Sequence, residues 1–141
     1  MRRLLLARCV LLLAGVSLPV RAAETTLFDE LGGRPGIERI VAEAVGLYTT
    51  DPRISADFDN IEPAHLRARL VEHLCVVTDG PCTYTGRSMS ASHKGLHLGR
   101  AQFNAVAEDF QTAMERCGIS YRTQNRVLAR LAPMQRDIVT R

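Results

Sequence analysis

The spacing of apolar residues between Pro63 and Val77 constrains the fold more than any other feature of the sequence. Four of them recur at intervals of four, four and three positions: Leu66, Leu70, Leu74 and Val77. This spacing puts the four side chains on one stripe of an α-helix, whereas a half-buried strand alternates at every second residue. Because no part of the chain shows that alternation, the sequence predicts an all-α fold.

Similar spacing elsewhere predicts about six helices, which suits one domain in a chain of 141 residues. Proline and glycine mark their expected ends, because proline favours the first turn and glycine the residue after the last. The predicted helices run over 27–31, from Pro35 to the Asp51-Pro52 pair, from Pro63 to 77, over 88–95 and 100–117, and from Ser120 onward with a bend at Pro133.

The first residues are typical of a secretory leader. Arg2, Arg3 and Arg8 precede an apolar run over 9–18, and Val20-Arg21-Ala22 supplies small side chains for a signal peptidase. We predict cleavage after Ala22, with Ala23 as the alternative, which gives a signal peptide over 1–22 and a globular domain over 23–141. An uncleaved anchor is the other reading, but the run is shorter than the about 20 residues that span a membrane. The mature protein is therefore expected to be exported, periplasmic or secreted, without stable membrane insertion.

Loss of the leader changes the charge. The whole chain carries +3, and the leader contains four arginines, so the net charge of the mature chain falls to −1. This removes the main support for a nucleic-acid partner, because such partners are bound through excess positive charge.

Two cysteines flank a predicted turn. Cys75 and Cys82 lie on either side of Asp79-Gly80-Pro81, close enough in sequence to form a disulfide in an oxidising compartment. Two unrelated buried thiols are the alternative. Cys117, near a predicted helix end, is expected to be a small core residue.

One histidine, His93, stands on a short predicted helix that begins at Ser88 and ends at Gly95. Met89 and Leu96 share its face, so the imidazole lies between apolar neighbours and can present a ring nitrogen to a metal. A haem iron requires such a ligand on its proximal side. A hydrogen-bonded core histidine is the ordinary alternative, and a zinc pair with His97 is another, although Gly95 interrupts the helix between the two.

Four stretches resemble the group I truncated haemoglobins. The string 84–89 followed by His93-Lys94-Gly95-Leu96 is similar to the proximal segment of that family. The other matching stretches are 26–33, 51–58 and 131–139, so the resemblance covers 27 to 139. It implies a two-over-two helical globin fold with haem between the layers, bound through His93. It also implies a diatomic gas as the ligand and an unidentified electron donor; we expect a monomer.

The resemblance assigns further residues to the haem site. It places Phe58 at the corner that packs on the haem, and Arg69 and Tyr84 near the haem propionates. For Arg69, a solvated surface charge is an equal alternative. The distal wall is expected to contain Leu66, Leu70, His73 and Leu74, and the proximal wall Met89, Leu98, Phe103 and Val106.

Several positions depart from the family. The usual Phe-Tyr pair, whose hydroxyl bonds the bound gas, is replaced by Ala44-Val45, and Tyr48, three residues later, is not expected to reach the same point. Leu70 stands where a glutamine is common. These substitutions predict an apolar distal pocket, with Val45 in its wall and weak, rapidly released dioxygen. His73, where the family has phenylalanine, could meet the haem edge, a propionate or the iron.

Three functions remain open from the sequence. The first is an exported protein that binds or transports dioxygen, nitric oxide or carbon monoxide reversibly. The second is a haem enzyme, either a nitric oxide dioxygenase or a peroxidase, and His73 is the one distal acid-base candidate for the latter. The third is a haem-free thiol or metal redox module built on Cys75, Cys82 and the histidines.

Overall fold

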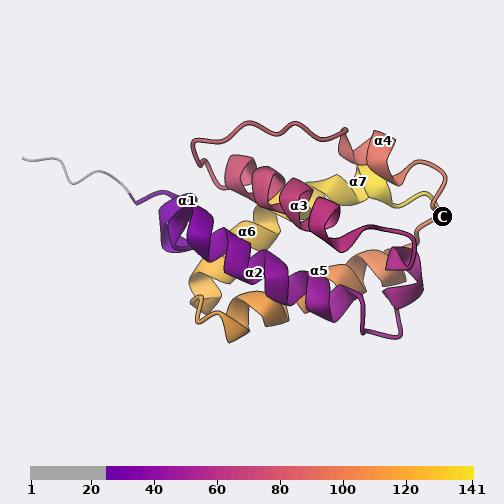
Figure 1. Cartoon of the computed structure of the whole chain (residues 1–141), viewed down its shortest axis with the longest axis horizontal. Coiled ribbons are helices and arrows are strands. Elements are labelled where there is room, and N and C mark those ends of the chain that lie inside the picture. The colour runs from indigo at the N-terminus through magenta and orange to yellow at the C-terminus, as the bar shows by residue number, and fades with distance from the viewer. Residues whose placement is uncertain (1–24) are drawn as a thin grey trace, which may run out of the picture.

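The computed structural model describes residues 25–141, so the predicted signal peptide and its cleavage point lie outside the described residues. This part of the chain is helical and has no strand (Figure 1). The α-helices are α1 Leu27–Glu30, α2 Gly33–Tyr48, α3 Pro63–Val77, α4 Met89–His93, α5 Arg100–Arg116, α6 Tyr121–Leu131 and α7 Gln135–Ile138. Two short 3-10 helices are η1 Ser55–Phe58 and η2 Ala132–Met134. The all-α prediction is confirmed.

Side-chain caps fix where the helices begin. The Ser88 and Ser120 hydroxyls accept hydrogen bonds from the N–H groups of Ala91 and Thr123, as their positions in the sequence predicted. The Glu62 carboxylate caps α3 by accepting from two backbone N–H groups, and these bonds hold its pKa below the ordinary value. One boundary differs: α2 begins at Gly33, two residues before Pro35, because Gly32 adopts a left-handed φ of 87° that redirects the chain there.

The long helices pack in two layers, as expected for a two-over-two fold (Figure 1). Helix α2 packs against both α3 and α5, and α5 packs against α6. The shared core is aliphatic, with Ile37, Ile40 and Val41 of α2 almost fully buried. Helix α1 closes one end by contacting α2 and α6. Within 25–141, no helix combines the length and apolarity needed to cross a membrane.

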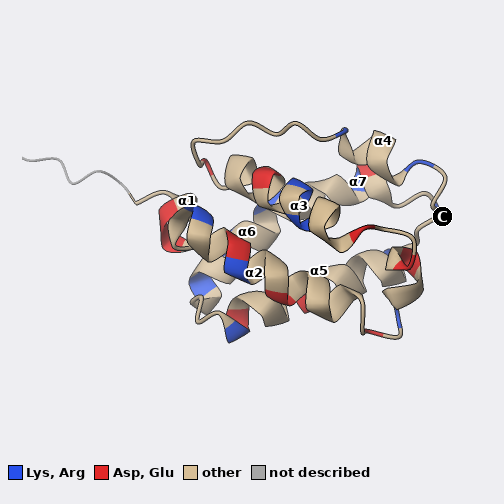
Figure 2. Ribbon diagram, viewed as in Figure 1, with Lys and Arg blue, Asp and Glu red and all other residues tan. Residues whose placement is uncertain are grey.

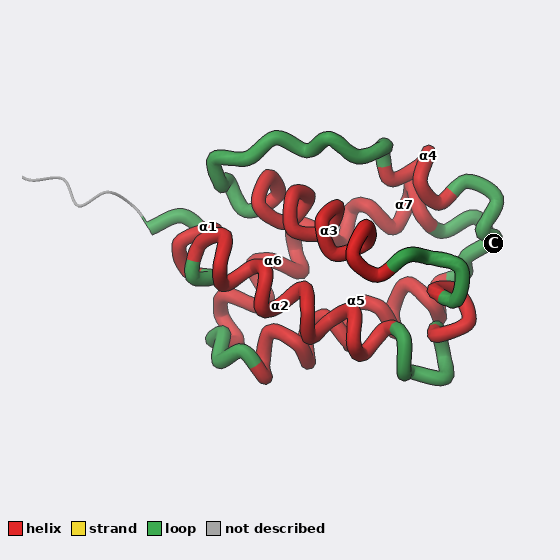
Figure 3. The backbone as a smooth tube through the Cα atoms, viewed as in Figure 1, coloured by secondary structure: helices red, strands yellow, loops and turns green. Residues whose placement is uncertain are grey.

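A long loop returns the chain from α3 to α4 along the outside of α3 (Figure 3). At its start, Cys75 and Cys82 form a disulfide with their Cα atoms 5.9 Å apart. Gly80 lies between them, and a Cβ there would come within 2.6 Å of the Cys75 sulfur, so only glycine fits. The tight turn that brings the two cysteines together therefore depends on this glycine.

We predict that reduction of this disulfide lowers the free energy of unfolding by about 2 to 3 kcal/mol, because a bridge across so short a loop removes that much chain entropy from the unfolded state. Urea unfolding of the protein with and without reductant measures the change. Cys117→Ala should show the same loss, whereas Cys75→Ala with Cys82→Ala should be insensitive to reductant. An unchanged wild-type curve would mean that the isolated protein carries two free thiols.

Candidate functional site

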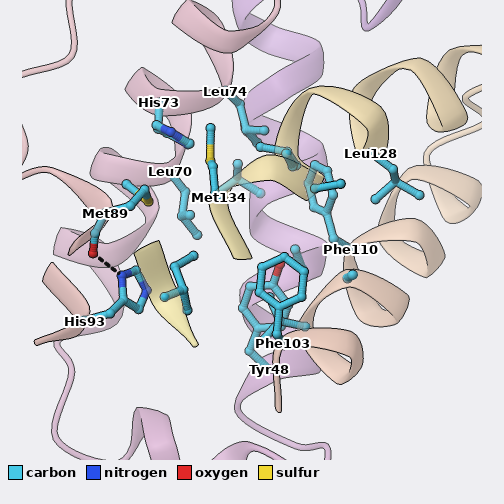
Figure 4. Close-up of a pocket in the computed structure, with 17 residues that line it drawn as sticks. Tyr48, Leu70, His73, Leu74, Met89, His93, Phe103, Phe110, Leu128 and Met134 are labelled. Carbon is cyan, nitrogen blue, oxygen red and sulfur yellow. Dashed lines mark hydrogen bonds between the residues drawn. The ribbon is translucent and has the colours of Figure 1, made fainter. Parts of the chain in front are cut away.

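One cavity of about 290 Å³ lies between the two helical layers (Figure 4). Almost all of its wall is carbon, and every α-helix except α1 contributes to it. The lining residues are Val41, Ala44, Tyr48, Leu70, His73, Leu74, Met89, His93, Phe103, Val106, Ala107, Phe110, Leu128, Leu131, Ala132, Met134 and Ile138. The polar side chains among them are Tyr48, His73 and His93, so these three determine what chemistry the cavity can perform.

His93 presents a defined ring nitrogen to the cavity. It is the last residue of α4, it is partly buried, and its Nδ1 lies 2.8 Å from the Met89 carbonyl oxygen. Because a carbonyl can only accept, Nδ1 carries the proton and donates, which leaves the lone pair of Nε2 available. Figure 4 shows the ring held by this bond at the edge of the cavity. A hydrogen bond of this kind fixes the tautomer and the orientation of a metal-binding imidazole.

Tyr48 lies on the opposite side of the cavity and was not among the residues that the sequence assigned to the site. Its side chain is only 4% exposed, and its hydroxyl makes no hydrogen bond with any part of the chain that the structure describes. Burial, helped by the Asp109 carboxylate, raises the pKa of Tyr48 well above its ordinary value. The hydroxyl therefore keeps its proton and remains a donor, so the wall formed by α2 is not wholly apolar.

His73 is the third polar residue of the cavity. It comes from α3, is partly buried, and meets the ring of Tyr84 edge-on with 5.3 Å between the ring centroids. Burial lowers the pKa of His73 below its ordinary value, so the imidazole is uncharged at neutral pH. A neutral imidazole can donate, accept or coordinate, but it brings no positive charge into the cavity.

The structure brings seven of the sequence-predicted site residues together in the cavity wall. They are His93, Leu70, His73, Leu74, Met89, Phe103 and Val106. Phe58 lies one layer behind, stacked on Tyr48 at 5.3 Å with an interplanar angle of 16°, and supports the wall from outside. Val45 belongs to the packed core, and Leu66 and Leu98 are partly exposed beside the cavity.

The two predicted propionate partners are engaged elsewhere. Arg69 pairs with Glu72 at 3.0 Å and also bonds the Thr85 hydroxyl, and its buried Nε has no partner in the described chain. The Tyr84 hydroxyl donates to the Arg87 carbonyl at 2.8 Å and so stabilises the loop before α4. Both side chains lie outside the set that lines the cavity.

Ten lining residues were not among the residues that the sequence assigned to the site: Val41, Ala44, Tyr48, Ala107, Phe110, Leu128, Leu131, Ala132, Met134 and Ile138. Phe110 follows Phe103 and Val106 at helical spacing, so extending the proximal stripe of α5 by one turn would have found it. Met134 and Ile138 lie beyond the predicted bend at Pro133, which falls in η2. The bend redirects these residues toward α4, and helical spacing across a bend does not predict direction.

Three comparisons with known proteins agree on the family. The profile described as "Bacterial-like globin" matches residues 26–140. The "Group 1 truncated hemoglobin GlbN" of a Nostoc species is 33% identical over 117 residues, which cover 83% of this chain and 99% of that protein. The GlbN of Mycolicibacterium paratuberculosis is 26% identical over 120 residues, covering 85% of this chain and 88% of that protein. The Fe(III) crystal structure of Tetrahymena pyriformis truncated hemoglobin has a TM-score of 0.80 at 22% identity, with 82% of this chain and 99% of that chain covered.

The similarity to the Tetrahymena structure establishes the fold, and the profile and the Nostoc relative establish the class: the chain is a bacterial-like globin. Within that class it belongs to the group I truncated haemoglobins, as its motifs predicted.

We predict that His73 makes the fold sensitive to mild acid. Because its folded pKa is lower than its unfolded pKa, the unfolded state takes up the proton first, so stability falls as the pH drops below about 6.5. Urea midpoints at about pH 7.5 and about pH 5.5 measure the loss for the wild type and for His73→Phe. The loss of stability should be smaller in His73→Phe than in the wild type. His65→Phe is the control, because His65 is exposed, and its loss should equal that of the wild type. Equal losses in all three proteins would contradict the prediction.

Proposed function

We propose that the protein binds haem through His93 and uses it to bind a diatomic gas reversibly. The observation that carries this proposal is the bond from His93 Nδ1 to the Met89 carbonyl, which leaves Nε2 free at the edge of a carbon-lined cavity. The membership of this chain in the truncated haemoglobin family supports the same cofactor.

The residues of the cavity suit a large, flat and mostly apolar group. Leu70 and Leu74 line the cavity from α3, and Phe103 and Val106 line it from α5. A flat group in the cavity is therefore contacted from two sides. Haem iron, when bound, supplies a coordination position for dioxygen, nitric oxide or carbon monoxide. The carbon lining excludes bulk water from that position, which favours reversible binding over oxidation.

Tyr48 changes the expected ligand preference. The sequence alone predicted a pocket without a donor, but this hydroxyl borders the cavity and has no partner in the described chain. A neutral hydroxyl stabilises a ligand that accumulates negative charge and has little effect on one that does not. We therefore propose that the pocket retains dioxygen better than its leucine-rich sequence indicated.

The other candidate functions keep less support. A haem enzyme, such as a nitric oxide dioxygenase, is favoured by the same Tyr48 donor and by His73 as an acid-base group. A haem-free metal module would need a cluster of ligands, and within 25–141 no three His, Cys, Asp or Glu side chains are placed to hold an ion. Export remains a proposal resting on the leader at 1–22, and N-terminal sequencing of the mature protein would check it.

We predict that His93→Gly abolishes the Soret band of the purified protein and that added imidazole restores it, because free imidazole can occupy the vacated volume and ligate the iron. His97→Gly is the matched control, since His97 is exposed and lies outside the cavity lining. If the Soret band is unchanged in His93→Gly, the assignment of His93 as the iron ligand is wrong.

We predict that Tyr48→Phe speeds dioxygen release by about tenfold, because it removes a hydrogen bond of about 1 to 2 kcal/mol and leaves the ring in place. Carbon monoxide release should change much less. Flash photolysis and stopped-flow mixing measure both rates. Tyr121→Phe is the control, because Tyr121 is 63% exposed and its hydroxyl bonds Glu115 on the surface. If Tyr48→Phe and wild type release dioxygen equally fast, the pocket is functionally apolar.

A further inference from the structure

Three arginines gather on the surface where α5 begins and the chain ends. Arg100 and Arg136 line one shallow cleft of about 180 Å³ together with Gln135 and Val139. The Arg141 side chain lies against Gly99, where its Nε would be 3.3 Å from an added Cβ. A backbone bond of 3.0 Å from Thr140 to the Leu98 carbonyl holds the two segments together. We call Arg100, Arg136 and Arg141 the basic face.

The cations of the basic face are exposed and make no ion pair with any described residue. Elsewhere in 25–141 most arginines are paired with carboxylates. The paired ones are Arg34, Arg53, Arg69, Arg116, Arg126 and Arg130. The positive charge of the basic face is therefore available to a partner, whereas most arginines elsewhere in 25–141 are already neutralised by a carboxylate.

Acidic residues are scarce in the same part of the chain. The segment 81–107 contains no Asp or Glu, and from 131 onward Asp137 is the only one. Arg87 precedes α4 and Lys94 follows it in the sequence, and Figure 2 shows basic segments on both sides of this helix. Residues 25–141 hold 14 basic and 14 acidic residues, once Arg2, Arg3, Arg8, Arg21 and Glu24 are removed from the totals of 18 and 15. The described chain is thus neutral as a whole but electrically polarised.

The basic face adjoins the helix that carries the candidate ligand. Helix α7, which carries Arg136, packs against α4, which carries His93, and its Ile138 lines the cavity. A molecule that docks on this face therefore contacts a helix that itself packs against the helix of His93. Oriented charge of this kind steers an oppositely charged partner and fixes its orientation.

We propose that the basic face docks an acidic electron-transfer protein that reduces the haem from the His93 side. The step transfers one electron: the donor protein is oxidised, the ferric iron becomes ferrous, and no covalent bond forms or breaks. The proposal rests on the proposed function, since a gas-binding haem that oxidises needs re-reduction. It adds the surface and the chemistry of the partner, an acidic one-electron donor protein.

The test removes three positive charges from either of two places. One variant combines Arg100→Gln, Arg136→Gln and Arg141→Gln; the matched control combines Arg39→Gln, Arg67→Gln and Arg122→Gln, which are exposed and unpaired in the described chain but lie on α2, α3 and α6. The probe is reduced plant-type ferredoxin, an acidic one-electron donor, mixed with the ferric haem protein at low salt. The Soret spectrum of each variant checks that the fold and haem binding are intact.

We expect the basic-face variant to be reduced about tenfold more slowly than wild type, the control variant about as fast as wild type, and the difference to disappear at about 1 M salt. Equal slowing in both variants would show a net-charge effect and overturn the proposal, as would no slowing in either. A second assay measures whether each protein sediments with phosphatidylglycerol vesicles. If the wild type and the control variant bind the vesicles and the basic-face variant does not, the face binds a membrane, and the proposal is overturned. A wild-type protein without a Soret band would refute the proposed function itself.

Discussion

The hydrogen bond from His93 to the Met89 carbonyl sets what the cavity can do. It lies within a helix of five residues and decides which imidazole nitrogen is protonated and which faces the cavity. Without it the ring could rotate, and either nitrogen could carry the proton. The remaining walls are almost entirely carbon and supply shape, whereas this bond gives an unprotonated imidazole nitrogen a fixed direction.

Helix α4 has no buried residue of its own, so its position depends on its neighbours. The loop before it is held against α3, where the Glu72 carboxylate accepts from both the backbone and the hydroxyl of Thr85, at 3.0 and 2.9 Å. The segment after it is tied to the end of the chain through Leu98 and Thr140. The Cys75–Cys82 bridge shortens the free length of the same loop. The placement of His93 is therefore a property of the loop and of α7, more than of the helix that carries it.

Helical spacing predicted the elements of the fold, but not the direction of long side chains. Spacing placed Leu70 and Leu74 on one helical stripe, and the resemblance to the truncated haemoglobins assigned them to the haem site; both line the cavity. Tyr48 was left out of the expected site because it lies three residues beyond Val45, but a helical side chain leans toward the N-terminus and covers the preceding turn. Ala44, one turn earlier, is small and leaves room for the ring, and both residues line the cavity. Arg69 pairs with Glu72 in this structure, and its predicted contact with a propionate stays a prediction.

The Tyr48 side chain combines packing with a potential hydrogen-bond donor. Its ring stacks on Phe58, and this contact uses only the ring. Its hydroxyl has no hydrogen-bond partner among the described residues, but its oxygen is not one of the fully buried unpaired atoms, so the missing partner costs the folded chain little. On the proposed function, a ligand that accepts from the hydroxyl gains a hydrogen bond that the protein itself does not use. The same side chain thus stabilises the wall through its ring and, under that proposal, offers a donor through its hydroxyl.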